Sequence, residues 1–276
     1  MHDQTINGFS VIFIDNILDK RLGAYLNIKE KDLTGRQSRF IAEGKVVLRV
    51  LLNSSQFDVE SLLITENKLA GMQDILSLCP ADVPVYCVSS TVMDEIAGFN
   101  VHRGILAVGK RKLPNTISSL LQFLPDNALI VILCGISNHD NIGSIFRNAA
   151  AFEAACIVLD ETCCDPLYRK AIRVSVGATL QIPYAHKGKI DDIVKTVAEA
   201  DINLIALSPG STQSLYDLPV TGKTALLLGT EGEGLPQHLL SSLQTARIPM
   251  SRKFDSLNVA TASGIALSCL SRRSFT

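Results

Sequence analysis

Hydrophobic and polar positions alternate along the first part of the chain in short segments of two kinds. Apolar residues at helical spacing predict helices over 38–52, 68–78 and 89–98, the last capped by Ser89 or Ser90 and ended by Gly98. Short apolar runs predict strands at 61–65, 83–88 and 104–108. Alternating strands and helices indicate a small α/β domain with a mostly parallel or mixed sheet.

A second series of alternating segments begins after residue 127. The predicted strands are 128–134, 155–159, 202–207 and 224–228, and the predicted helices are 142–152, a segment after Pro166, 190–200 and 258–270. The strands are almost entirely apolar, as a parallel sheet covered by helices on both faces requires. This region is therefore predicted to be a second α/β domain.

These patterns divide the chain into four parts. Residues 1–30 lack sustained periodicity and form an N-terminal extension that could pack on a partner. Residues 31–110 form the first domain, 111–126 a linker with turn signals at Pro114 and Pro125, and 127–276 the second domain. A length of 276 residues suits two domains.

Composition narrows the class of protein. The net charge of −1 does not by itself indicate a nucleic-acid-binding protein, but basic residues cluster over 20–49 and at Lys110–Lys112. Such clusters form either a solvated face or a phosphate-contacting surface. No apolar run approaches the roughly 18 residues of a membrane span, and the N-terminus lacks a signal-peptide pattern, so a cytoplasmic protein is expected. Seven cysteines without metal-ligand spacing predict reduced thiols and no metal site.

Ligands of open α/β sheets bind beyond the carboxyl ends of strands, so the loops there are candidate sites. After the strand at 128–134 come Asn141, Gly143 and Arg147, which also have a structural interpretation, with Asn141 or Asp140 as the helix N-cap. After the strand at 224–228 comes a glycine-rich loop, 229–236. Its two carboxylates and its glycine spacing disfavour a nicotinamide or flavin dinucleotide.

A third candidate loop runs from Ile248 to Asn258 and leads into the last helix. Ser256 or Asp255 as a simple N-cap would account for part of it, but not for Ile248-Pro249-Met250.

Together these stretches resemble the SpoU (TrmH) family of RNA ribose 2′-O-methyltransferases, within the knotted SPOUT superfamily. The resemblance rests on three motifs in order: Asn141-x-Gly143-x-x-x-Arg147, Leu228-Gly229-x-Glu231-Gly232-x-Gly234, and Ile248-Pro249-Met250 with Ser256-Leu257-Asn258-Val259. Segment 173–178 also resembles the family. Segments 40–44 and 102–107 resemble the ribosomal-protein-L30-like substrate-binding domain that often precedes it.

The resemblance implies a trefoil knot near the C-terminus, a homodimer whose two subunits form the active site, and transfer of a methyl group from S-adenosylmethionine to a ribose 2′-hydroxyl of tRNA or rRNA. It implies a cofactor pocket lined by Leu207, Gly229, Ile248, Met250 and Leu257. The implied catalytic residues are Arg147, Asn141, Glu231, Ser256 and Asn258.

A guanidinium with a pKa above about 12 is a poor base, so we expect Arg147 to hold the target phosphate and to stabilise the incipient alkoxide. The other four residues would fix the ribose and the loops. The sulfonium cofactor has no phosphate, which makes carboxylates in the glycine loop acceptable.

The sequence departs from the family at Arg252, where many relatives have Gly, and at Ala260, where Ser is frequent. Arg252 is a candidate RNA contact. A non-catalytic RNA-binding protein that uses the second domain as a dimer scaffold is the alternative function, and Arg147, Glu231 and Asn258 at the motif positions argue against it.

Overall fold

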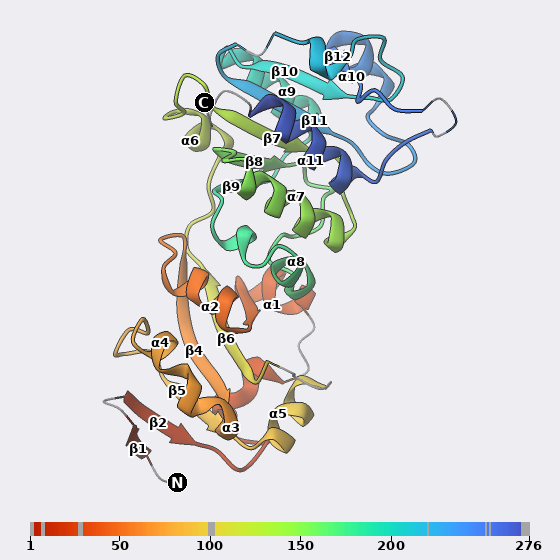
Figure 1. Ribbon diagram of the computed structural model, residues 1–276. Coiled ribbons are helices and arrows are strands. Elements are labelled where there is room, and N and C mark those ends of the chain that lie inside the picture. Colours follow the sequence, from red (N-terminus) through yellow and green to blue (C-terminus); the bar gives the residue numbers. More distant parts are fainter. Residues whose placement is uncertain are drawn as a thin grey trace. The chain divides into compact units, whose positions relative to one another are not determined.

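The structure, a computed structural model, describes residues 3–6, 9–26, 30–98, 103–219, 221–251, 253 and 255–271. The chain forms two compact units, each built around a six-stranded sheet (Figure 1). The first unit comprises Met1–Leu113 and Leu167–Gln181, and the second comprises Pro114–Pro166 and Ile182–Thr276. Each unit is described on its own below.

The sheet of the first unit has the strand order β1-β2-β5-β4-β6-β3 and mixes parallel with antiparallel pairs, as the sequence pattern predicted. Its elements are β1 (Asp3–Ile6), β2 (Phe9–Phe13), η1 (Lys20–Tyr25), α1 (Glu30–Gln37), β3 (Arg39–Glu43), α2 (Lys45–Leu52), β4 (Phe57–Thr65), α3 (Glu66–Leu69), η2 (Ala70–Met72), α4 (Gln73–Leu76), β5 (Val85–Val88), α5 (Ser90–Ala97), β6 (Ile105–Arg111), α8 (Arg169–Val174) and η3 (Ala178–Leu180).

The helix predicted over 38–52 was wrong in its first half. Residues Arg39–Glu43 form β3, which pairs antiparallel with β6, and the helix begins only at Lys45. Gly44 separates the two elements with a φ of 88°, a conformation that favours glycine and interrupts a helix. Because Phe40 and Ile41 are both buried, the strand lacks the alternation that would have distinguished it from a helix.

Other predictions for this unit were partly right. Ser89 caps α5, since its side chain accepts a hydrogen bond from Val92 N at 3.2 Å, and Gly98 ends the helix with a φ of 69°. The predicted helix 68–78 is divided into α3, η2 and α4. The N-terminal extension is not separate, because β1 and β2 extend the sheet of this unit, with β2 parallel to β5.

Segment Leu167–Gln181 groups with the first unit although it lies far along the chain. Arg169 forms a shielded ion pair with Glu43 at 2.7 Å. Ser54 Oγ donates to the Leu180 carbonyl and Gln56 Nε2 donates to the Gln181 carbonyl, each at 3.0 Å. The sequence carried no signal for this grouping.

The second unit contains an entirely parallel sheet with the order β12-β10-β11-β7-β8-β9. Its elements are α6 (Ile117–Leu121), β7 (Leu129–Leu133), α7 (His139–Ala151), β8 (Cys156–Leu159), β9 (Tyr184–His186), α9 (Ile190–Glu199), β10 (Asn203–Leu207), η4 (Leu215–Asp217), β11 (Thr224–Leu228), α10 (Gln237–Ser242), β12 (Gln244–Ala246) and α11 (Val259–Leu270). Every residue of β7, β8 and β11 is buried, which confirms the parallel sheet that their apolar runs predicted.

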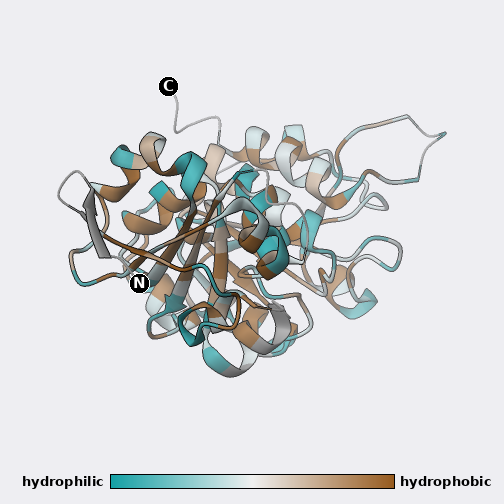
Figure 2. Cartoon of the chain, turned by 90° about the horizontal axis from the view of Figure 1, so that it is seen from below, coloured by the Kyte–Doolittle hydropathy of each residue, from teal (hydrophilic) through white to brown (hydrophobic). Residues whose placement is uncertain are grey.

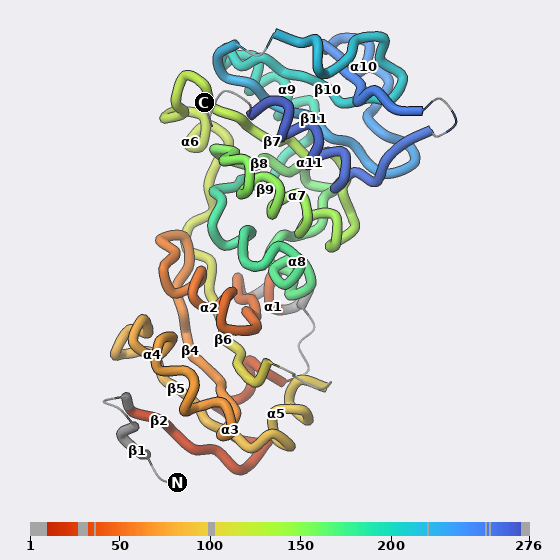
Figure 3. Tube along the Cα trace, viewed as in Figure 1, coloured from red at the N-terminus to blue at the C-terminus, as the bar shows by residue number. Residues whose placement is uncertain are grey.

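The helices position this sheet and its loops. Individual helices carry both hydrophilic and hydrophobic residues (Figure 2), and α9 buries Ile193 and Val197 in the core of the second unit. Helices α7 and α11 lie side by side (Figures 1 and 3), although more than 100 residues separate them in the sequence. The carboxyl ends of β7, β10 and β11 lead into the segments that carry the first two motifs or line a pocket beside them.

Candidate active site

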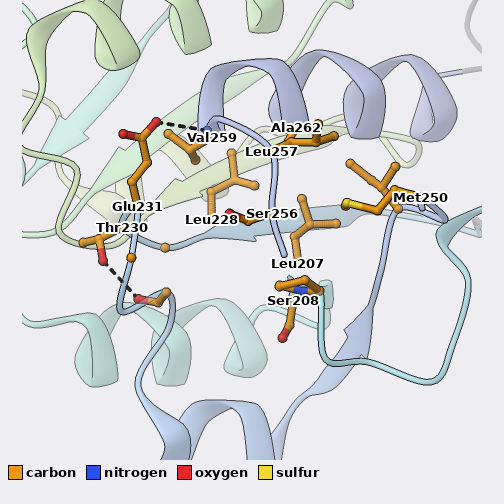
Figure 4. Close-up of a pocket in the computed structure, with 15 residues that line it drawn as sticks. Leu207, Ser208, Leu228, Thr230, Glu231, Met250, Ser256, Leu257, Val259 and Ala262 are labelled. Carbon is orange, nitrogen blue, oxygen red and sulfur yellow. Dashed lines mark hydrogen bonds between the residues drawn. The ribbon is translucent and has the colours of Figure 1, made fainter. Parts of the chain in front are cut away.

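A pocket lies beyond the carboxyl ends of β10 and β11, where an open parallel sheet binds ligands (Figure 4). The empty space within it, including space open to solvent, is about 720 Å³. The lining residues are Leu207, Ser208, Pro209, Leu228, Gly229, Thr230, Glu231, Gly232, Gly234, Ile248, Met250, Ser256, Leu257, Val259 and Ala262.

The pocket brings together all five residues for which the resemblance implies a cofactor role. Leu207 ends β10, Gly229 follows β11, Ile248 and Met250 follow β12, and Leu257 precedes α11. Figure 4 labels Leu207, Met250 and Leu257 among the residues that line the pocket. Sequence-distant turns therefore converge on one apolar cavity.

The glycine loop is folded tightly on itself. A Cβ at Gly229 would lie 2.6 Å from the carbonyl carbon of Gly234, and Thr230 Oγ1 donates to the Gly234 carbonyl oxygen at 3.4 Å. Gly232 and Gly234 have φ angles of 93° and 70°, which side chains rarely adopt. The glycines are thus needed for the shape of the pocket wall.

Asn258 joins the three motifs through its side chain. Its Nδ2 donates to Asn141 Oδ1 at 3.0 Å and also to Glu231 Oε1, and its Oδ1 accepts from Ala260 N at 3.0 Å. Val259 N donates to the same carboxylate oxygen of Glu231 at 3.4 Å (Figure 4). One residue therefore caps α11 and connects it to the glycine loop and to α7.

The structural interpretations of these motifs as simple helix caps were wrong. Asn138 caps α7 by accepting from Asp140 N at 2.8 Å and Asn141 N at 3.4 Å. The cap of α11 is Asn258, so neither Ser256 nor Asp255 has that role. The buried side chain of Asn141 is consequently available to contact Asn258.

The proposed catalytic residues do not all reach the pocket. Glu231 and Ser256 line it, whereas Asn258, which contacts both Glu231 and Asn141, is not among the lining residues, and neither is Asn141. Arg147 is exposed on α7 and is not among the lining residues. Within the described part of the chain it has no hydrogen bond or ion pair, which leaves the guanidinium available to a group from outside.

Several residues of the site were not predicted from the sequence. Ser208 and Pro209 follow β10, and the rule that ligands bind after strand ends could have identified them. Asp160, which follows β8, accepts hydrogen bonds from Gly135 N, Thr162 N and Cys163 N at 3.0 to 3.1 Å. It fixes the loop that leads into α7, and no sequence pattern indicates this.

Two buried cysteines of the second unit have thiol pKa values raised above the ordinary value. Burial raises the pKa of Cys156 from 9.0 to about 12, and burial together with Asp160 raises the pKa of Cys134 to about 12. These thiols are free and serve as core residues.

The described residues lack both a metal cluster and a membrane-spanning helix. They contain no group of three His, Cys, Asp or Glu side chains that could hold a metal ion. None of their helices is long and apolar enough to cross a membrane. Arg252, predicted as a possible RNA contact, and His102 of the motif in the first domain lie outside the described residues.

Comparisons with known proteins agree with this geometry. An uncharacterised tRNA/rRNA methyltransferase of Mycobacterium bovis is 37% identical over 243 residues, which cover 86% of this chain and 82% of that protein. A 23S rRNA (guanosine-2′-O-)-methyltransferase of Vibrio parahaemolyticus is 27% identical over 73% of this chain and 82% of its own length.

The fold is similar to that of an rRNA methyltransferase from Sinorhizobium meliloti solved with bound S-adenosylmethionine, with a TM-score of 0.81 and 22% identity over 96% of this chain and 99% of that one. The model of the SpoU rRNA methylase family matches residues 128–268, which contain all three motifs and every lining residue of the pocket. The chain therefore belongs to the SpoU rRNA methylase family.

Proposed function

We propose that this protein transfers a methyl group from S-adenosylmethionine to a ribose 2′-hydroxyl of tRNA or rRNA. The observation that carries the proposal is the convergence of the three family motifs on one pocket, joined by Asn258 to Asn141 and Glu231. Relatives named as tRNA/rRNA and 23S rRNA 2′-O-methyltransferases support the reaction and the class of substrate. With such substrates the enzyme acts in the cytoplasm.

The residues of the pocket fit S-adenosylmethionine. Leucine, isoleucine and methionine side chains suit the adenine ring, and backbone groups of the strand-end loops can recognise its edge. Glu231 is the only charged side chain among the described residues that line the pocket, and its sign is opposite to that of a sulfonium. The bound cofactor supplies an activated methyl group on this positive sulfur.

The remaining chemistry is orientation of the ribose and stabilisation of its oxygen. The 2′-hydroxyl releases its proton to water and gains negative character during transfer, and a guanidinium stabilises such charge without giving up its own proton. We assign this role to Arg147, which also holds the adjacent phosphate through its paired N–H groups. Ser256 fixes the ribose at the edge of the pocket, while Asn141, Glu231 and Asn258 hold the loops in position.

The exposure of Arg147 supports a homodimeric enzyme. Arg147 is absent from the lining of the pocket, although the role proposed for it requires the guanidinium to lie beside the methyl donor. In a symmetric dimer, α7 of one subunit supplies its arginine to the pocket of the other. The trefoil knot and the RNA-binding role of the first unit, implied by the resemblance, belong to the same proposal.

Transfer of labelled methyl groups to RNA tests the function. Purified protein, labelled S-adenosylmethionine and total RNA from cells that lack the gene are incubated, and the RNA is then hydrolysed with alkali. A 2′-O-methyl group blocks cleavage of the adjacent phosphodiester, so we expect the label in alkali-resistant dinucleotides. Label in mononucleotides would indicate base methylation, and no incorporation would support the non-catalytic RNA-binding alternative.

A further inference from the structure

Helices α7 and α11 are joined at a second point beyond the Asn141–Asn258 contact. Asn148 Nδ2 donates to the Ala260 carbonyl oxygen at 2.8 Å and to Ser263 Oγ at 2.9 Å. Ser263, which is fully buried, donates in turn to the Ala260 carbonyl at 2.7 Å. The side-chain amide of Asn148 is thus held at two acceptors on the first turns of α11.

The close approach of the two helices depends on Gly264. A Cβ at this position would come within 3.2 Å of Asn148 Nδ2, so a larger residue would push the amide away from its acceptors. Asn141 and Asn148 are seven residues apart and lie on the same side of α7, two turns from each other. Both contact the beginning of α11, which fixes the rotation of α7 as well as its distance.

Arg147 is the residue next to Asn148 and points about 100° further around the helix. Its side chain has no hydrogen bond within the described residues. The direction in which the side chain leaves the helix is therefore set by the position and rotation of α7. The first turn of α11 also supplies Val259 and Ala262 to the pocket. Asn148 therefore connects the turn that carries Arg147 to the helix that forms the wall of the pocket.

We propose that Asn148 is a positioning residue for Arg147: by bonding to Ala260 and Ser263 it fixes the rotation of α7 and hence the direction in which the guanidinium meets the ribose. This inference rests on the proposed function of Arg147. Because reacting groups must be placed to within about 1 Å, a small rotation of α7 reduces turnover without removing any group that contacts RNA or cofactor.

Replacement of Asn148 by Ala leaves a foldable protein. Ser263 Oγ and the Ala260 carbonyl remain hydrogen-bonded to each other, so the change leaves neither group buried without a partner. Asn203→Ala is the matched control, because Asn203 also donates from Nδ2 to a backbone carbonyl, that of Thr221 at 2.7 Å, but lies on β10 away from both helices.

The test measures kcat, the KM for RNA and the Kd for S-adenosylmethionine of N148A, and then introduces Arg147→Lys into the wild type and into N148A. We expect N148A to lower kcat by about ten- to a hundredfold while KM and Kd stay within about threefold, and N203A to change none of them. We expect R147K to lower kcat by at least about a hundredfold in the wild type but by less than about tenfold in N148A, since the two residues act together.

Unchanged kcat in N148A would overturn the inference. So would an equal cost of R147K in both backgrounds, because Asn148 would then act independently of the arginine. In both cases R147K still lowers kcat in the wild type, so the proposed role of Arg147 stands while the inference about Asn148 fails. If R147K has no effect in the wild type, the proposed role of Arg147 itself fails, and the inference fails with it.

Discussion

Asn258 donates from Nδ2 to Asn141 Oδ1 at 3.0 Å and thereby connects the start of α11 to the first turn of α7, 117 residues earlier. The same amide nitrogen donates to Glu231, and the side-chain oxygen of Asn258 caps α11 by accepting from Ala260 N and Thr261 N. The three motifs are thus held by one side chain, in which the amide nitrogen joins the loops and the oxygen caps the helix.

This division of roles gives a first prediction. Asn258→Asp keeps the capping oxygen but replaces the donor with a second carboxylate oxygen facing Glu231. Loss of a hydrogen bond to a charged group costs about 1.5 to 3 kcal/mol, so we expect the affinity for S-adenosylmethionine to fall about tenfold or more in calorimetry. Asn138→Asp, the same change at the cap of α7, serves as control. Equal affinity of N258D and wild type would contradict the network.

Gly229 gives a prediction about the shape of the pocket. Gly229→Ala places a Cβ 2.6 Å from the backbone of Gly234, so the glycine loop must open and the pocket wall must move. We expect binding of S-adenosylmethionine to be lost. Gly210→Ala is the control, since its Cβ meets nothing closer than 3.8 Å. Normal binding by G229A would mean that the closed loop is not needed for the cofactor.

The homodimer gives a prediction about mixtures of two inactive variants. Arg147→Ala removes the arginine, and Ser208→Trp fills the pocket from a partly exposed position. If the arginine acts in the pocket of the other subunit, co-refolding equal amounts restores about a quarter of the sites, because one site of each mixed dimer is intact. Methyl transfer to RNA is measured before and after mixing. Persistent inactivity of a mixture that has exchanged subunits would place the arginine and the pocket in the same subunit.

The buried thiols predict a loss of stability at high pH. Burial holds the pKa of Cys156 at about 12 against 9.0 for an ordinary thiol, so between these values the folded state binds more protons than the unfolded state. The free energy of unfolding should therefore decrease as pH rises from 9 towards 12, by at most about 1.4 kcal/mol per pH unit for this group. Urea titrations at pH 8, 9.5 and 10.5 measure the slope. Cys156→Ala should flatten it, and an identical slope in C156A would contradict the assignment.

Sequence periodicity predicted the second unit well because its sheet is parallel and covered on both faces. Its long strands are uninterrupted apolar runs, and the helices between them bury one side. The short strands β9 and β12 have only three residues each, too few for a periodic pattern. In the first unit, β3 and α2 are both apolar and adjoin without a loop, so only the positive φ of Gly44 distinguishes them.

The candidate site was predictable as far as it depends on motifs. Leu207, Gly229, Ile248, Met250 and Leu257 line a single pocket, and the loops were expected at strand ends. The connections made by Asn258 could not be predicted, because a side-chain amide can cap a helix or join distant loops and here does both. Asn148 and Asp160 belong to no motif and act only through the packing of segments far apart in sequence.

The most direct test of the central claim is a map of 2′-O-methyl positions in total RNA from three kinds of cell: with the gene, without it, and without it but carrying the R147K variant. We expect at least one position in tRNA or rRNA to lose its methyl group on deletion, and we expect R147K not to restore it. An unchanged map after deletion would contradict the proposed reaction. Full restoration by R147K would contradict the role of Arg147 in it.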